Sequence, residues 1–143
     1  MYTVTIEAGF SAMHRVRLPD GVLEPPHSHD WRIQALFSRD KLDESAMVID
    51  FDVARSTLET VLAGLHQTDL NSHPGLAGRN PTAEVVARYV FEQMHTLGLN
   101  TLRRIEVTEA PGCVAGFEVT DPIEHPRKDR ELTMNTAIHR MDG

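Results

Sequence analysis

The N-terminal part of the chain alternates apolar and polar residues in the manner of β-strands. From Tyr2 to Phe10 every second residue is apolar, and the residues between them are polar or glycine, which is the period of a strand with one buried face. A second alternating run extends from about His29 to Phe37. A loop rich in proline and glycine separates the two runs. The pattern predicts an antiparallel hairpin whose first strand runs into His14.

Two stretches in the middle of the chain change to the spacing of helices. Apolar residues recur at steps of three and four within residues 54–65 and again within residues 86–97, so each stretch presents one apolar face. Asp50 precedes the first stretch and is its predicted N-cap. Asn80 is the predicted cap of the second stretch, and Gly98 ends it. We therefore expect two amphipathic helices.

A second hairpin is predicted after these helices. Apolar runs over residues 102–109 and 113–119 flank the turn-forming sequence Ala110-Pro111-Gly112. The resulting order is strand, strand, helix, helix, strand, strand. This order predicts an α+β fold in which a four-stranded antiparallel sheet carries both helices on one face.

The length of 143 residues fits a single domain that can bury a substantial core. We place this domain at residues 1–120. Residues 121–143 are polar, lack sustained periodicity and include prolines. We expect them to form a tail that is ordered only where a neighbouring subunit holds it.

Charge and cysteine content narrow the classes of partner. The formal net charge is -7 and the basic residues are scattered, which argues against nucleic acid or an anionic membrane surface as a partner. Cys113 is the single cysteine, so no internal disulfide can form, and we expect it to be a small buried hydrophobic side chain. The sequence shows no charged-then-apolar leader and no long apolar run. A soluble, cytoplasmic protein is therefore expected.

Three histidines carry the candidate chemistry. His27 and His29 are one residue apart at the start of the second strand, and residues two apart in a strand point to the same side. With His14 they offer three imidazole nitrogens. Three neutral imidazoles and one open position form the ligand set of a catalytic zinc. This interpretation requires the three rings to converge and the fourth position to stay free of protein ligands; the alternative is a set of ordinary surface or hydrogen-bonded histidines.

Five short motifs occur in one order along the chain. They are Phe10-Ser11-Ala12-x-His14, His27-x-His29, Val48-Ile49-Asp50-Phe51, Asn80-Pro81-Thr82-x-Glu84 and Thr108-Glu109. In this order they resemble the 6-pyruvoyltetrahydropterin synthase family, which includes the bacterial 6-carboxytetrahydropterin synthases of the queuosine pathway. The likeness spans roughly residues 2–119 and leaves the tail uncovered.

The resemblance implies a fold, an assembly and a reaction. The fold is the tunnelling fold (T-fold), in which trimers close their sheets into a barrel and two trimers stack into a homohexamer with active sites at subunit interfaces. Closure would also remove the exposed edges of an open four-stranded sheet. The implied enzyme is a lyase that acts on the side chain of 7,8-dihydroneopterin triphosphate or a related dihydropterin.

The resemblance also assigns roles to single residues. His14, His27 and His29 become ligands of Zn²⁺. Glu109 becomes the anchor of the pterin substrate, because a carboxylate can accept two hydrogen bonds from the paired donors of a guanidine-like ring edge.

The chain departs from the family pattern at the proposed catalytic groups. Leu23 stands where most members have a catalytic cysteine. Glu24 matches instead a branch in which a glutamate replaces that cysteine, and this branch resembles enzymes that cleave the side chain to 6-hydroxymethyl-dihydropterin for folate-type pathways. The usual Asp-His dyad is also changed, so a relay would have to be rebuilt, with His66 oriented by Asp69 as the candidate pair.

Two other classes of function stay open from the sequence. The first is a family member without catalytic activity that keeps zinc and a pterin pocket. The second is a cupin, in which a His-x-His pair also occurs, although a cupin consists of many strands and two predicted helices interrupt the strands here.

Overall fold

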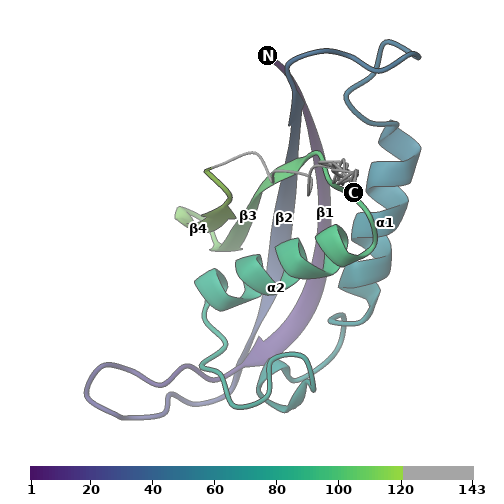
Figure 1. Ribbon diagram of the computed structural model, residues 1–143. Coiled ribbons are helices and arrows are strands. Elements are labelled where there is room, and N and C mark those ends of the chain that lie inside the picture. Colours follow the sequence, from purple (N-terminus) through teal and green to yellow (C-terminus); the bar gives the residue numbers. More distant parts are fainter. Residues whose placement is uncertain (121–143) are drawn as a thin grey trace, which may run out of the picture.

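A computed structural model of the protein describes residues 1–120. The predicted tail, residues 121–143, lies outside the described residues. Figure 1 shows one sheet with two helices packed against it. No helix within residues 1–120 is long and apolar enough to cross a membrane.

The sheet has four antiparallel strands that follow one another in space as they do in sequence. They are β1 (Tyr2–His14), β2 (His27–Arg39), β3 (Leu102–Ala110) and β4 (Cys113–Glu118). β1 and β2 pair along their whole length, from Tyr2 opposite Arg39 to His14 opposite His27. The two predicted hairpins are therefore confirmed, and β2 begins at His27.

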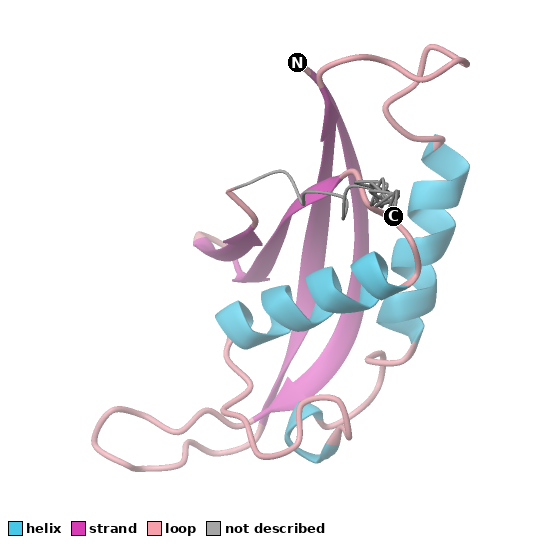
Figure 2. Ribbon diagram, viewed as in Figure 1, coloured by secondary structure: helices cyan, strands magenta, loops and turns pink. Residues whose placement is uncertain are grey.

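Two helices cover one face of the sheet. They are α1 (Phe51–Ala63) and α2 (Ala83–Thr96), with a short 3-10 helix η1 (Leu70–Ser72) between them. α1 packs on β1, and α2 packs on β3 and β4 (Figures 1 and 2). The predicted α+β order is confirmed, and an architecture with two helices excludes the cupin alternative.

The two predicted helix caps have different outcomes. Asp50 caps α1, because its carboxylate accepts hydrogen bonds from the backbone N–H groups of Asp52 and Val53. The prediction for α2 is wrong: Thr82 is the N-cap. The side chain of Asn80 instead exchanges two hydrogen bonds with the backbone of Arg17, at 2.8 and 3.0 Å. Asn80 thus connects the start of α2 to the chain that follows β1.

The core lies between the helices and the sheet. The inward-facing residues of β2, beginning with Trp31, are fully buried, and they meet the apolar stripes of α1 and α2. His14, His27 and His29 continue the same alternation at the ends of β1 and β2. The strand pattern therefore directs all three histidines toward the side of the sheet that the helices cover.

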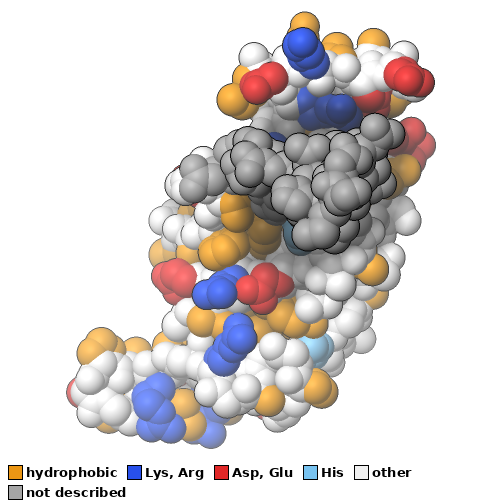
Figure 3. All heavy atoms as spheres, viewed as in Figure 1, with side chains coloured by type: hydrophobic (Ala, Val, Ile, Leu, Met, Phe, Trp, Pro, Cys, Tyr) orange, Lys and Arg blue, Asp and Glu red, His pale blue; other side chains and the backbone are white. Residues whose placement is uncertain are grey.

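The opposite face of the sheet is polar. Arg32 pairs with Glu7 across the first hairpin; Arg104 pairs with Glu106 on the same strand and with Glu118 across the second hairpin. Figure 3 shows the other side of the molecule, which carries the helices, and there Lys and Arg side chains occur at both ends and in the middle. This surface agrees with the scattered basic positions in the sequence.

Cys113 corrects one expectation. Its side chain is exposed, whereas the sequence predicted a buried hydrophobic residue. Cys113 is the first residue of β4, directly after the turn that contains Gly112 with φ +79°. Apolar character in this short edge strand therefore does not imply burial.

The cap of α1 gives a test of the fold. Replacement of Asp50 by Ala leaves the N–H groups of Asp52 and Val53 without an acceptor, so the free energy of unfolding should fall by about 1 kcal/mol. Urea unfolding followed by circular dichroism measures this change. The matched control is Asp40→Ala, an exposed aspartate that should change stability by less than about 0.5 kcal/mol. Equal effects of the two variants would contradict the capping role.

Candidate metal centre

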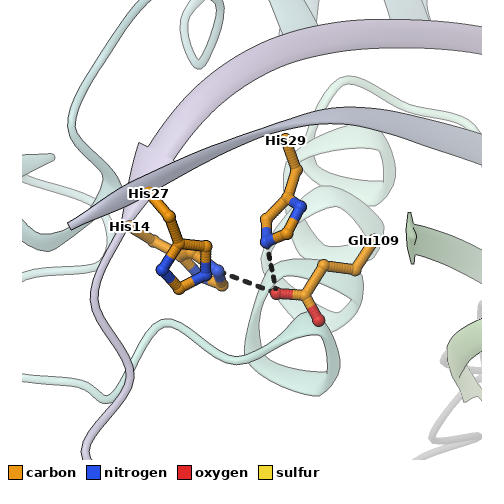
Figure 4. Close-up of side chains that lie close together, drawn as sticks. All are labelled: His14, His27, His29 and Glu109. Atoms are coloured by element: carbon orange, nitrogen blue, oxygen red, sulfur yellow. Dashed lines mark ion pairs between the residues drawn. The ribbon is translucent and has the colours of Figure 1, made fainter. Parts of the chain in front are cut away.

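Strand pairing brings the three predicted histidines together. His14 lies directly opposite His27 in the β1–β2 register, and His29 lies opposite Ala12. The ring centroids are 4.7 Å apart for His14 and His27, 5.2 Å for His14 and His29, and 4.7 Å for His27 and His29. Figure 4 shows the three rings turned toward a common centre. The convergence that the sequence interpretation required is present.

Backbone carbonyl groups fix two of the rings in a form suited to a metal. Nδ1 of His14 lies 2.8 Å from the carbonyl oxygen of Pro81, and Nδ1 of His27 lies 3.0 Å from that of Pro25. A carbonyl oxygen can only accept, so each Nδ1 carries the proton and donates it. Each Nε2 then presents a lone pair, as in metal-binding histidines whose second nitrogen is held by a hydrogen bond.

Glu109 supplies a fourth donor to the same centre. Its Oε1 lies 2.7 Å from Nε2 of His14 and 3.3 Å from Nε2 of His29 (Figure 4). One ligand atom from each of these residues and one from His27 all lie within 4.8 Å of one another. The structure thus assembles three imidazoles and one carboxylate, so the second requirement of the sequence interpretation, a fourth position free of protein ligands, is not met in this arrangement.

The polar atoms at this centre fit a bound cation. His14 is fully buried, and Nε2 of both His14 and His29 is buried without a hydrogen bond. Oε1 of Glu109 is only 2.7 Å from Nε2 of His14. In the neutral ring with its proton on Nδ1, Nε2 is an acceptor, so it cannot donate a hydrogen bond to this carboxylate oxygen. A cation held among the four side chains would replace this repulsion by attraction and satisfy the unpaired atoms, with Oε1 of Glu109 displaced slightly from Nε2 of His14. We conclude that the residues fit a metal ion.

The titration of His29 favours the same conclusion. Burial lowers the pKa of His29 below its ordinary value, and the neighbouring His14 and His27 lower it further, although Glu109 opposes this shift. The neutral ring is therefore favoured near neutral pH. A neutral imidazole is the form that binds a metal.

Glu24, the predicted general base, lies beside this cluster. Its Oε1 is 3.5 Å from Nε2 of His27 and accepts a hydrogen bond of 2.9 Å from the backbone N–H of Val16. The backbone of Glu24 also pairs with Val16, and its carbonyl oxygen accepts from the guanidinium group of Arg15. These contacts hold the carboxylate at the edge of the metal centre, partly buried.

The other two predicted catalytic residues are not joined to each other. Nδ1 of His66 accepts a hydrogen bond of 3.1 Å from the backbone N–H of Ser11. The carboxylate of Asp69 caps η1 by accepting from the backbone N–H of Asn71 at 3.0 Å. No hydrogen bond joins His66 to Asp69 within residues 1–120. Their segment runs along the free edge of β1, where Met13 donates its N–H to the carbonyl of Thr68.

The position of Glu109 in the cluster was missed by sequence reasoning, which gave it a substrate role alone. A signal was available in the alternation of β3. Ile105 and Val107 are buried against the helices, so Glu109, two residues further, points to the side that holds the histidines. The alternation alone could not predict that β3 pairs with β2, and this pairing brings the end of β3 close to the histidines.

Metal analysis tests the centre directly. Replacement of His27, which is partly exposed, by Gln should remove a ligand without opening the core. We expect the affinity for zinc to fall by more than the roughly 10- to 100-fold typical of losing a residue that only supports a ligand. Competition with a chromophoric chelator measures this affinity. His95→Gln on α2 is the matched control and should bind zinc as the wild type does; equal affinity of all three proteins would contradict the assignment.

The comparisons with known proteins agree with this picture. The family model for 6-pyruvoyl tetrahydropterin synthase matches residues 3–119. A 6-carboxy-5,6,7,8-tetrahydropterin synthase of Synechocystis is 29% identical over 122 residues, which cover 82% of this chain and 93% of that protein.

Solved structures show the same fold. The 6-pyruvoyl tetrahydropterin synthase of Caenorhabditis elegans has a TM-score of 0.70 at 21% identity, covering 84% of this chain and 98% of that one. The Plasmodium vivax enzyme has a TM-score of 0.66 at 13% identity, covering 82% and 97%. Two further structures of the Plasmodium vivax protein carry replacements of a catalytic glutamate by cysteine or alanine. Since the family model spans almost all of the described residues, the chain belongs to the 6-pyruvoyl tetrahydropterin synthase family.

Proposed function

We propose that this protein is a zinc-dependent lyase that processes the side chain of 7,8-dihydroneopterin triphosphate or a related dihydropterin. The enzyme class follows from the family; the metal and the substrate are our proposal. The observation that carries it is the convergence of His14, His27 and His29 beside two carboxylates, those of Glu109 and Glu24.

Zinc suits the donor set. Three imidazole nitrogens with at most one carboxylate oxygen are a ligand combination typical of zinc, whereas magnesium and calcium prefer sites made of oxygen atoms. When bound, zinc acts as a Lewis acid and increases the acidity of a hydroxyl group at its open position. The hydrogen bonds from His14 and His27 to backbone carbonyl groups orient both rings before the metal arrives.

Glu109 anchors the pterin ring in this proposal. A carboxylate matches the paired N–H donors of the ring's guanidine-like edge in a charge-assisted bidentate contact. Glu109 is partly exposed, at 27%, so a substrate can reach it. Its place beside the histidines keeps the anchored ring close to the metal centre.

Glu24 is the proposed general base. One oxygen is held by the N–H of Val16, which fixes the carboxylate beside His27 and leaves the second oxygen for a substrate proton. A base must lie within hydrogen-bonding reach of that proton, either directly or through one water. Within one subunit, His66 accepts from the N–H of Ser11 and Asp69 accepts from the N–H of Asn71, and neither residue belongs to the donor cluster, so we assign the proton transfer to Glu24.

The same residue favours a second candidate product. Leu23 occupies the usual position of the catalytic cysteine, and Glu24 lies next to the metal centre. In the Plasmodium vivax protein, which has the same fold, a glutamate is a catalytic residue. The second candidate is therefore side-chain cleavage to 6-hydroxymethyl-dihydropterin. A zinc- and pterin-binding protein without turnover is the remaining alternative.

The proposed assembly is a homohexamer built from two trimers. β1 and β4 are the two edges of the sheet, and closure of three sheets into a barrel would pair them and remove both edges. In such a homohexamer the active sites would lie at the interfaces between subunits. The proposed location is the cytoplasm, in a queuosine or folate-type pathway, with a dihydropterin as the partner and neither nucleic acid nor membrane.

Replacement of Glu24 by Gln tests the catalytic proposal. The variant keeps the size of the side chain but cannot accept a proton, so turnover should fall by about 100-fold or more, while binding of zinc and pterin should stay intact. Products formed from dihydroneopterin triphosphate and from dihydroneopterin are identified by mass spectrometry. Glu44→Gln, in the exposed loop after β2, is the matched control.

Each outcome of this experiment separates the candidates. Normal turnover by the Glu24→Gln variant would contradict its role as the base. Pterin binding without product in the wild type would favour the non-catalytic alternative. The mass of the product distinguishes 6-pyruvoyl, 6-carboxy and 6-hydroxymethyl pterins.

A further inference from the structure

The carboxylate of Glu109 has two possible partners, the metal at the histidine cluster and the pterin ring. In the structure its Oε1 completes a ring of donors with the three histidines, whereas the proposed function assigns it to the pterin. We propose that Glu109 is an exchangeable metal ligand. It closes the centre while no substrate is bound, and the pterin ring opens the centre by drawing the carboxylate away. This inference rests on the proposed function.

The closeness of these atoms supports a closed resting state, in which the carboxylate would move outward as the ion enters, because two ligand atoms of a tetrahedral zinc lie roughly 3.3 Å apart. Oε1 is 2.7 Å from Nε2 of His14 and 3.3 Å from Nε2 of His29, and both nitrogens are buried without a hydrogen bond. Three imidazoles and one carboxylate oxygen fill the four positions that zinc ordinarily uses in proteins. With Glu109 in place, the set lacks the free position that a catalytic zinc needs.

Glu109 is also less restrained than His14. The β3–β4 register shifts between Thr108 and Ala110, so Glu109 has no partner on β4. Bulges of this kind redirect side chains and are common beside active sites. His14, by contrast, is fully buried and tied to the carbonyl of Pro81. Within residues 1–120 the carboxylate of Glu109 makes no close polar side-chain contact except with His14 and His29.

Departure of Glu109 would free a position at the metal and would also change the acidity of a hydroxyl group that binds there. A carboxylate ligand partly neutralises the charge of the cation, so its departure strengthens the effect of that charge on a hydroxyl group that enters. Two changes then coincide with binding of the pterin ring: the position becomes free, and the incoming hydroxyl becomes easier to deprotonate. Without substrate, the same position is protected from water and other ligands.

Zinc affinity tests the resting state. We expect Glu109→Gln and Glu109→Ala to bind zinc roughly 10-fold or more weakly than the wild type, in line with the loss of a group that supports metal binding. The matched control is Glu106→Gln, on the same strand but paired with Arg104 on the opposite face of the sheet. Circular dichroism verifies that each variant folds. Unchanged affinity in both Glu109 variants would overturn the inference.

Cobalt substitution tests the exchange. The Co²⁺ form of the intact chain is titrated with 2-amino-4-oxopteridine, which has the guanidine-like edge but no side chain to reach the metal. We expect binding to shift the visible absorption of Co²⁺ in the wild type and in Glu106→Gln, but not in Glu109→Gln. Pterin fluorescence reports binding independently.

The outcomes separate this inference from the proposed function. Pterin binding with an unchanged wild-type spectrum, or an equal shift in Glu109→Gln, would overturn the exchange and leave the proposed function standing. Failure of the wild type to bind the pterin would overturn the exchange and the proposed substrate together. In that case the zinc affinities would still show whether Glu109 is a ligand.

Discussion

The register of β1 against β2 is the constraint on which the candidate metal centre depends. His14 lies opposite His27, and both point toward the helices because the alternation that buries Phe10 and Trp31 continues to the strand ends. A slip of one residue would turn every side chain of one strand to the other face. Such a slip would expose the core of β2 to water, so the same free energy that stabilises the fold also holds the imidazoles together.

Residues from η1 to the start of α2 support the end of β1, where His14 lies. The carbonyl of Pro81, just before α2, accepts from His14, and Asn80 beside it pairs with the backbone of Arg17. Asn71, within η1, exchanges a similar pair of hydrogen bonds with Arg15. Two asparagine side chains thus continue the backbone pairing of β1 beyond the last residue of the strand. Through these contacts η1 and the segment that follows it fix the strand end that carries His14.

Sequence periodicity was sufficient for the elements but not for the contacts between them. The alternation of the strands, the stripes of the helices and the cap at Asp50 are local patterns, and each was predicted correctly. The errors concern residues whose role depends on a distant partner or on a strand's place in the sheet. Asn80 pairs with Arg17 instead of capping α2, and Cys113 is exposed because β4 is an edge. Glu109 could be assigned to the donor cluster only once the order of the strands in the sheet was known.

Two carboxylates beside one group of histidines raise the question of how their tasks differ. Glu24 is held by the N–H of Val16 and lies 3.5 Å from His27. Glu109 lies closer to His14 and His29, at 2.7 and 3.3 Å, and has no partner on β4. A proton acceptor benefits from a fixed position, because its alignment with the proton determines the rate. A ligand that must leave benefits from freedom to move. The geometry therefore suits the two roles that we propose, a fixed base for Glu24 and an exchangeable ligand for Glu109.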